Sequence, residues 1–203
     1  MINNIVIKYV LIGDSCVGKS CIAEQYAEEY FNSSPPETIG VDFFSVKFDY
    51  TIDNTKYNIT NHIYDTGGEC GLEDIIKTYY IKANYIILVF DLTRPITFFN
   101  LKNRFTIIKK KLKITDNYPT FILVGNKKDS IYKNISQKSI NNFTQMFNMD
   151  YIEISAKYFN DVTNMFNSLN MKYLHKYIEN KKSYVIPPKE KDSRCCSKIC
   201  IIS

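Results

Sequence analysis

Apolar residues along the chain follow two different periods, and each period predicts one kind of secondary structure. Residues 5–12, 85–91 and 121–125 are apolar at nearly every position, which is typical of strands buried on both faces of a parallel sheet. Elsewhere apolar residues recur every three or four positions, which predicts helices with one face in water. This helical pattern covers residues 21–30, 97–113, 136–147 and 161–179. Strands and helices therefore alternate along most of the chain.

An alternating pattern of apolar and polar side chains marks residues 41–50 and 56–65. Asp53-Asn54 supplies a turn between them, so we expect an antiparallel hairpin. A second loop with a short helix runs through Tyr80, and residues 151–154 form a last short strand. Together these elements favour a doubly wound α/β fold: a six-stranded, mostly parallel sheet with one antiparallel edge hairpin and helices on both faces. In such folds ligands bind at the carboxyl ends of the strands.

The composition fits one domain with a short tail. Of the 203 residues 45% are hydrophobic, which is enough for a single sizeable core. The periodic pattern stops near Lys181 and Pro187-Pro188 follows, so we expect a domain over residues 1–180 and a flexible tail over residues 181–203. The net charge of +5 is modest, and no basic run is interleaved with aromatic residues. We therefore expect no nucleic-acid partner. We also expect the protein to be a monomer.

Neither a membrane-spanning helix nor a disulfide framework is visible in the sequence. The longest apolar stretch, residues 85–90, is far shorter than the roughly 18 residues of a spanning helix. The first residues lack the charged and apolar regions of a secretory signal, so we expect a cytosolic protein. Three of the cysteines lie in the last nine residues, a spacing that suits neither a disulfide framework nor a zinc site.

Residues 13–20 read Gly-Asp-Ser-Cys-Val-Gly-Lys-Ser and fit the phosphate-loop pattern G-x-x-x-x-G-K-[ST]. The pattern lies between a predicted strand and a predicted helix, which is the context that it requires. Gly13 and Gly18 let the backbone N–H groups and the helix N-terminus point at phosphate oxygens. Lys19 adds a positive charge for the β- and γ-phosphates, and the Ser20 hydroxyl is placed to bind Mg²⁺. A chance glycine-rich turn is the alternative interpretation.

Further motifs follow in order at the ends of later strands. They are Asp65-Thr66-Gly67-Gly68, Asn126-Lys127-Lys128-Asp129 and Ser155-Ala156-Lys157, with Phe31 and Thr38 in the loop before the hairpin. Through these motifs, residues 5–180 resemble the Rab branch of the Ras superfamily of small GTPases. The resemblance implies a P-loop GTPase domain that binds GTP, GDP and Mg²⁺. Each motif taken alone also has an ordinary structural interpretation, as a polar turn, a helix start or a core residue.

The resemblance also assigns roles to individual residues. Asp129 accepts hydrogen bonds from N1–H and the exocyclic amine of guanine, and Phe31 lies across the base. Ser20, Thr38 and Asp65 hold Mg²⁺, the last through water. Hydrolysis involves Lys19, Thr38, Gly68 and Glu69. The expected nucleotide-binding residues are Ser15, Cys16, Val17, Gly18, Lys19, Ser20, Cys21, Phe31, Thr38, Gly68, Asn126, Lys127, Asp129, Ser155, Ala156 and Lys157.

The likeness to the Rab branch in particular depends on two segments. Residues 38–43 resemble its switch I sequence, and Thr78-Tyr79-Tyr80 resembles its S-Y-Y. The resemblance implies an aromatic triad of Phe43, Tyr64 and Tyr80 that effector proteins read, beside Ile39. Tyr64 replaces the usual tryptophan of this triad.

The segment after Asp65 departs from the family pattern D-T-A-G-Q-E-R-F. Glu69 stands where the family has the glutamine that positions the attacking water. A carboxylate only accepts hydrogen bonds and repels the anionic γ-phosphate, which argues for slow hydrolysis, but it is also the better proton acceptor. Gly67 and Gly71 depart from this pattern as well, and in the phosphate loop Cys16 stands where many relatives carry glycine. These changes concern hydrolysis and partner contacts rather than nucleotide binding.

Residues 200–203 read Cys-Ile-Ile-Ser and fit the prenylation pattern C-a-a-X. We expect a prenyltransferase to modify Cys200, with Cys195 or Cys196 supplying a second anchor by palmitoylation. The protein would then lie on the cytoplasmic face of intracellular membranes, with a cytosolic pool.

The leading hypothesis is a Rab-like GTP/GDP switch in vesicle traffic, whose partners are an exchange factor, a GTPase-activating protein and effectors. One alternative is a GTP-bound interaction module that scarcely hydrolyses its nucleotide. Another is a Ras- or Rho-like signalling GTPase.

Overall fold

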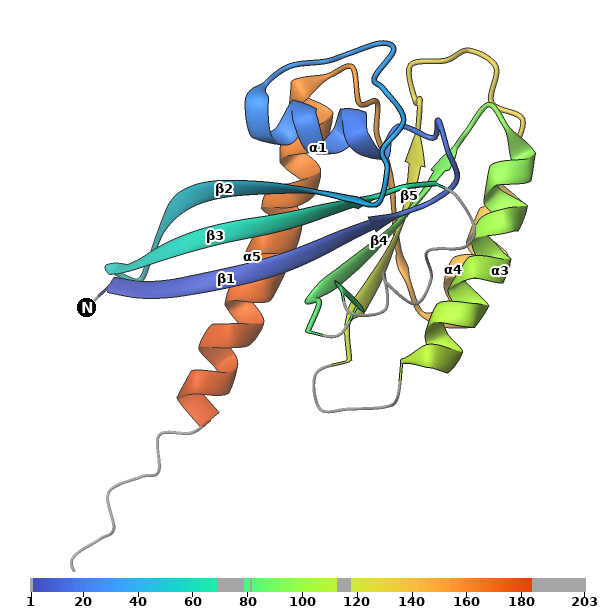
Figure 1. Cartoon of the computed structure of the whole chain (residues 1–203). Helices are drawn as coiled ribbons and strands as arrows, with labels where there is room; N and C mark the ends of the chain where they lie inside the picture. Colours follow the sequence, from blue (N-terminus) through green and yellow to red (C-terminus); the bar gives the residue numbers. More distant parts are fainter. Residues whose placement is uncertain (1, 69–78, 81, 113–117, 184–203) are drawn as a thin grey trace, which may run out of the picture. The chain divides into compact units, whose positions relative to one another are not determined.

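The computed structural model describes residues 2–68, 79–80, 82–112 and 118–183, and its six strands form one sheet in the order β2-β3-β1-β4-β5-β6 (Figure 1). Four of the strand pairs are parallel: β1–β3, β1–β4, β4–β5 and β5–β6. The remaining pair of the described sheet, β2–β3, is antiparallel. The strands are β1 (Ile2–Ile12), β2 (Val41–Ile52), β3 (Thr55–Thr66), β4 (Tyr85–Asp91), β5 (Thr120–Asn126) and β6 (Asp150–Glu153). The predicted fold class is confirmed.

The edge hairpin turns at Asp53 and Asn54, as the sequence predicts. Both residues have positive φ angles, 49° and 59°, which is the geometry that matches a two-residue turn to the twist of its strands. The hairpin puts Asp65 next to Leu11 of β1 in the parallel register. The acidic end of β3 is thereby held beside the segment that follows β1.

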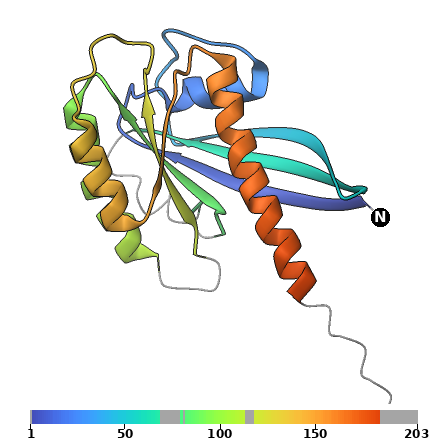
Figure 2. The ribbon, with the colours of Figure 1, turned by 180° about the vertical axis from the view of Figure 1, so that it is seen from behind.

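Four helices are found in the described residues: α1 (Lys19–Glu28), α3 (Pro95–Lys111), α4 (Gln137–Phe147) and α5 (Phe159–Ser183). Side chains alternate between the two faces along each buried strand. Val10 and Ile12 join Phe98 of α3 and Phe143 of α4 in one core, where these two rings lie 5.7 Å apart. Figures 1 and 2 show α3 and α4 on the same side of the sheet.

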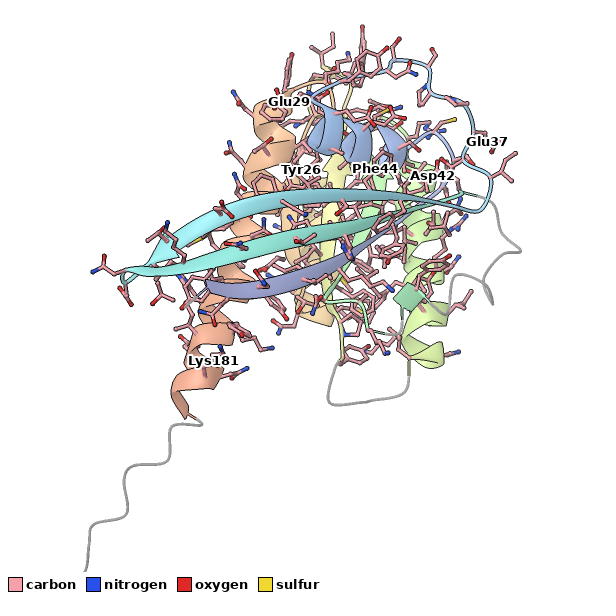
Figure 3. All side chains as sticks on the ribbon, turned by 60° about the vertical axis from the view of Figure 1, so that its left-hand side comes forward. Tyr26, Glu29, Glu37, Asp42, Phe44 and Lys181 are labelled. Carbon is pink, nitrogen blue, oxygen red and sulfur yellow. The ribbon has the colours of Figure 1, made fainter. Side chains whose placement is uncertain are left out.

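The opposite face of the sheet packs against α1 and the first part of α5. Tyr9 of β1 meets Phe166 edge-on, with ring centroids 5.2 Å apart. Tyr26 of α1 stacks on the same Phe166 at 3.9 Å and on Phe48 of β2 at 5.5 Å. Figure 3 labels Tyr26 on α1 above β2. The central strands are therefore covered on both faces, as parallel strands require, and β4 is buried along its whole length.

The chain divides into two compact units, residues 1–168 and 169–203, and the division falls inside α5. The expected domain boundary after residue 180 stays a prediction. Among the described residues, no helix combines the length and the apolar character needed to cross a bilayer.

Helix α1 begins and ends earlier than the apolar pattern predicts. Its last residue is Glu28, because Glu29 adopts a left-handed conformation with a φ of 54° that no helix continues. The predicted helix over residues 21–30 includes Tyr30. Tyr30 lies beyond the observed helix and is exposed, so that part of the prediction is wrong.

Gly13→Ala should cost about 3 kcal/mol in the free energy of unfolding, at the upper end of overpacking effects. A Cβ atom at Gly13 would lie 2.2 Å from the Val89 carbonyl oxygen, and backbone of a central strand cannot move away cheaply. Gly40→Ala is the matched control, since its φ of 83° strains an alanine but no atom lies within 4 Å. We expect it to cost about 1 kcal/mol. Chemical denaturation measures both values; equal losses would contradict this description of Gly13.

Candidate functional site

The site lies along the edge of the sheet where the parallel strands end. Figure 1 shows β1, β4 and β5 pointing toward this edge. The segment after β1 is the phosphate-loop motif, and β3 and β5 end in Asp65-Thr66 and Asn126. Asp91 at the end of β4 pairs with Asn126 in the sheet register. Residues that are far apart in the sequence therefore meet at one edge.

The phosphate-loop motif forms a tight turn that leads into α1. Gly18 has a φ of 97°, and a Cβ atom there would lie 2.2 Å from the Asn126 side-chain nitrogen. The Asn126 amide donates to the Val17 carbonyl oxygen at 2.8 Å and accepts from the Ala156 N–H at 3.0 Å. Asn126 thus ties the loop after β1 to the loop after β6. Cys16 adopts a φ of 61°, which explains why a glycine suits this position better.

The Lys19 side chain is buried in this turn, with 6% of the residue exposed. Its amino group donates to the Asp14 carbonyl oxygen at 2.9 Å. Burial lowers the pKa of Lys19, while the negative charge of Asp65 opposes that shift. A partly desolvated ammonium is a strong partner for an anion that enters the loop.

Three oxygen-bearing side chains converge beside Lys19. Ser20 donates to Asp65 Oδ2 at 2.6 Å, Thr38 donates to the same atom at 3.1 Å, and the two hydroxyl oxygens lie 2.9 Å apart. Asp65 Oδ1 is buried and has no hydrogen-bond partner among the described residues. Burial raises the pKa of Asp65, although the Ser20 hydrogen bond and the Lys19 charge oppose it. A buried carboxylate with an unused oxygen attracts a cation.

These oxygens fit Mg²⁺, a hard cation that prefers oxygen ligands and keeps several waters or phosphate oxygens in its shell. Among the described residues no three His, Cys, Asp or Glu side chains gather at one point. A metal that needs four protein ligands is therefore a poorer fit than one that takes two hydroxyls and one carboxylate. When bound, Mg²⁺ would neutralise phosphate charge next to Ser20 and Thr38.

The other end of the site centres on Asp129, after β5. Its carboxylate accepts from Ser155 Oγ at 2.7 Å and pairs with Lys157 Nζ at 2.6 Å. Burial disfavours the charged form, but the hydrogen bonds from Lys157 and Ser155 outweigh it and lower the pKa of Asp129. The carboxylate is thus ionised at neutral pH and oriented by its neighbours.

A single pocket of about 980 Å³ connects the two ends. Fifteen of the sixteen residues predicted to bind nucleotide line it: Ser15, Cys16, Gly18, Lys19, Ser20, Cys21, Phe31, Thr38, Gly68, Asn126, Lys127, Asp129, Ser155, Ala156 and Lys157. Val17, the sixteenth, is fully buried and contributes through its carbonyl bond to Asn126. Glu37, labelled in Figure 3 on the segment between α1 and β2, accepts from Ser15 Oγ at 3.3 Å.

The prediction did not include Asp91, which organises the middle of the site. Its buried carboxylate pairs with Lys127 at 2.7 Å and with Arg94 at 2.9 Å, and Arg94 also donates to the Ser15 carbonyl oxygen at 3.1 Å. The Lys127 and Thr93 hydrogen bonds outweigh burial and lower the pKa of Asp91. The sequence does contain a signal for Asp91, because it is a charged residue at the end of an otherwise apolar strand.

The aromatic residues expected to face effectors are only partly where the prediction puts them. Ile39 and Phe43 are 94% and 52% exposed, and Phe43 lies 5.2 Å from Tyr64 between ring centroids. Tyr80 is only 5% exposed and belongs to the core with α3, so the prediction that it faces a partner is wrong. Its neighbour Tyr79 instead packs on Tyr64 at 5.2 Å. Of Tyr79 and Tyr80, packing rather than the sequence pattern decides which ring is fully buried.

Four predicted site residues lie outside the described residues. They are Glu69, Cys195, Cys196 and Cys200. Water positioning by Glu69 and lipid attachment to the cysteines stay predictions from the sequence.

Comparison with known proteins identifies the family of this chain. The family model described as "Ras family" matches residues 8–175. The chain belongs to the Ras family. Among the curated relatives of this Ras-family protein, "Ras-related protein SEC4" of Saccharomyces cerevisiae is 38% identical over 61% of the chain and 54% of the relative. "Ras-related protein Rab-28" of Caenorhabditis elegans is 33% identical over 61% of the chain and 49% of the relative.

A longer match is found with "GTP-binding protein ypt1" of Schizosaccharomyces pombe, which is 34% identical over 72% of the chain and 69% of the relative. The chain spans about half the length of the first two relatives. These matches support a Rab-type small GTPase of the Ras superfamily, and the predicted family is confirmed.

Proposed function

We propose that this Ras-family chain is a Rab-like switch in vesicle traffic, which binds GTP or GDP with Mg²⁺ and hydrolyses GTP. The observation that carries the proposal is the single pocket that is lined by Ser20 and Thr38 at one end, where both hydroxyls donate to the buried Asp65, and by the ionised Asp129 at the other. The similarity to the relative named "GTP-binding protein ypt1" supports a guanine nucleotide as the ligand. Exchange factors, GTPase-activating proteins and effectors are the partners that such a switch requires.

Each part of the pocket has a separate task in this proposal. The backbone of residues 13–18 and the buried ammonium of Lys19 hold the β- and γ-phosphates. Ser20, Thr38 and Asp65 hold Mg²⁺, which supplies charge neutralisation at the phosphates. Asp129, kept ionised by Lys157 and Ser155, selects guanine because adenine lacks donors in that arrangement.

The switch itself would involve the segments that carry Thr38 and Gly68. Gly67 already donates to the Gly40 carbonyl oxygen at 2.9 Å, so the two segments touch. A γ-phosphate would add contacts to both and shift them to one arrangement, which loses support after hydrolysis. Ile39 and Phe43 are exposed here, so effectors would meet a different surface in each of the two states.

We place the protein on the cytoplasmic face of intracellular membranes, with a cytosolic pool.

Glu69→Gln should raise the single-turnover rate of GTP hydrolysis by about tenfold, within the range that a well-placed group supplies in proton-transfer chemistry. A glutamine amide accepts from the attacking water and donates toward the phosphoryl group, whereas a carboxylate repels it. GTP affinity should stay within about twofold, since Glu69 follows the glycine that contacts the phosphate.

The same experiment decides between two candidate functions. Turnover by the natural protein, slow but measurable, fits a switch. No turnover by the natural protein with recovery in Glu69→Gln fits a persistent GTP-bound interaction module, which the glutamate at this position favours. A natural protein that is faster than the variant would show that the carboxylate accepts the water proton productively.

A further inference from the structure

Arg104 of α3 reaches across to the phosphate end of the pocket. Its Nη2 atom donates to the Gly68 carbonyl oxygen at 2.6 Å, and its Nε atom pairs with Asp14 Oδ1 at 3.2 Å. Only 17% of the Arg104 side chain is exposed. Asn100, one helical turn earlier, donates to the other Asp14 oxygen at 2.8 Å. Helix α3 thus binds the phosphate loop and the segment after β3 at once.

The two segments that Arg104 joins are already in close contact. A Cβ atom at Gly68 would lie 2.2 Å from the Ser15 nitrogen, so the two backbones pack directly on one another. A guanidinium presents several N–H donors in a rigid plane, and here two of them reach acceptors on different segments. An amine on a flexible chain has no such fixed geometry.

The acceptors of Arg104 lie at the phosphate end of the pocket. Gly68 lines the pocket together with Ser15 and Lys19, and Asp14 is the second residue of the phosphate-loop motif. The guanidinium is therefore close to the place where the phosphates of a nucleotide would lie. The motifs that carry the resemblance to the family do not include residue 104.

We propose that Arg104 is a positioning residue that holds Gly68 against the phosphate loop and thereby favours GTP over GDP. The inference rests on the proposed function. The Gly68 N–H would contact only the γ-phosphate, which GDP lacks. Holding this N–H in place would therefore raise the affinity for GTP and leave the affinity for GDP unchanged. A residue that acts on one nucleotide state changes the ratio of the two affinities, because only differential contacts shift an equilibrium.

The test compares Mg²⁺-dependent binding of GDP and of a non-hydrolysable GTP analogue in the natural protein, Arg104→Met and Arg104→Lys. For Arg104→Met we expect about a tenfold loss for the GTP analogue, the order expected for charged hydrogen bonds, and a change within about twofold for GDP. Arg104→Lys should give an intermediate loss, because one ammonium cannot hold both acceptors in the same geometry. Lys110→Met is the control, since Lys110 is exposed on the same helix and its loss removes the same charge.

If both Arg104 variants bind the two nucleotides with the same affinities as the natural protein, the inference is overturned. An equal loss of affinity for both nucleotides would also overturn it, because Arg104 would then have only a structural role. If Arg104→Met does not fold, Arg104→Lys decides, because it keeps the charge and most of the packing. In each of these cases the natural protein still binds guanine nucleotides. Failure of the natural protein to bind them would instead contradict the proposed function.

Discussion

Asp129→Asn is expected to weaken GDP binding by about 10²–10³-fold and to make the xanthine nucleotide the better ligand. The carboxylate would accept two hydrogen bonds from guanine, and bonds to a charged group are each worth about 1.5–3 kcal/mol. Asparagine offers one acceptor and one donor. Its donor opposes the exocyclic amine of guanine and suits the carbonyl group that xanthine has at that position.

The geometry of the site supports a large effect at this position. Lys157 and Ser155 hold the Asp129 carboxylate at 2.6 and 2.7 Å, so it is oriented before a base arrives. Competition between GDP and xanthosine diphosphate for the purified variant measures the change. Asp49→Asn is the control, because Asp49 is exposed on the edge strand β2. A variant that keeps the natural base preference would show that Asp129 does not read the base.

Lys19→Met should reduce the affinity for GDP and GTP by about 10²–10³-fold, through the loss of charge-assisted bonds to two phosphate groups. Methionine keeps the apolar stem of the buried side chain and removes the ammonium. The preference for guanine over xanthine should stay unchanged, since Lys19 lies at the opposite end of the pocket from Asp129 in this assignment. An unchanged base preference with weaker binding would show that Lys19 binds the phosphates and does not read the base.

Nucleotide titration at constant Mg²⁺ measures the Lys19 effect. Lys138→Met is the control, because Lys138 is exposed on α4 and its loss removes the same charge. The circular dichroism spectrum of Lys19→Met should match that of the natural protein, because removing an already desolvated charge does not weaken the core. A folded Lys19→Met variant that binds GDP as tightly as the natural protein would contradict the role of the ammonium.

Most of the fold and most of the pocket could be predicted because their signals are local. Continuous apolar runs mark the central strands, and Asp53-Asn54 marks the hairpin by its turn chemistry. Motifs that directly follow parallel strands must meet at one edge of the sheet, so Lys19, Asp65 and Asp129 are brought together by topology. The sequence thus predicted the pocket without any knowledge of distances.

The remaining features depend on packing between distant segments. Nothing in the local sequence shows that Arg104 reaches Asp14, since the two are joined only when α3 lies on the sheet. Tyr79 and Tyr80 are chemically identical, and only the orientation of the backbone decides which ring is buried. The end of α1 at Glu29 is likewise a matter of one backbone angle, which residue type alone does not determine.

The measurement closest to the central claim is the identity of the nucleotide that the natural protein binds. Protein purified in the presence of Mg²⁺ is denatured, the released nucleotide is identified by mass spectrometry, and GTP and ATP are then compared in competition with labelled GDP. We predict close to one guanine nucleotide per chain and at least a 10³-fold preference for GTP over ATP, roughly the discrimination available to a site that hydrogen-bonds a substrate N–H. A protein that releases no guanine nucleotide, or from which ATP displaces GDP as well as GTP does, would contradict it.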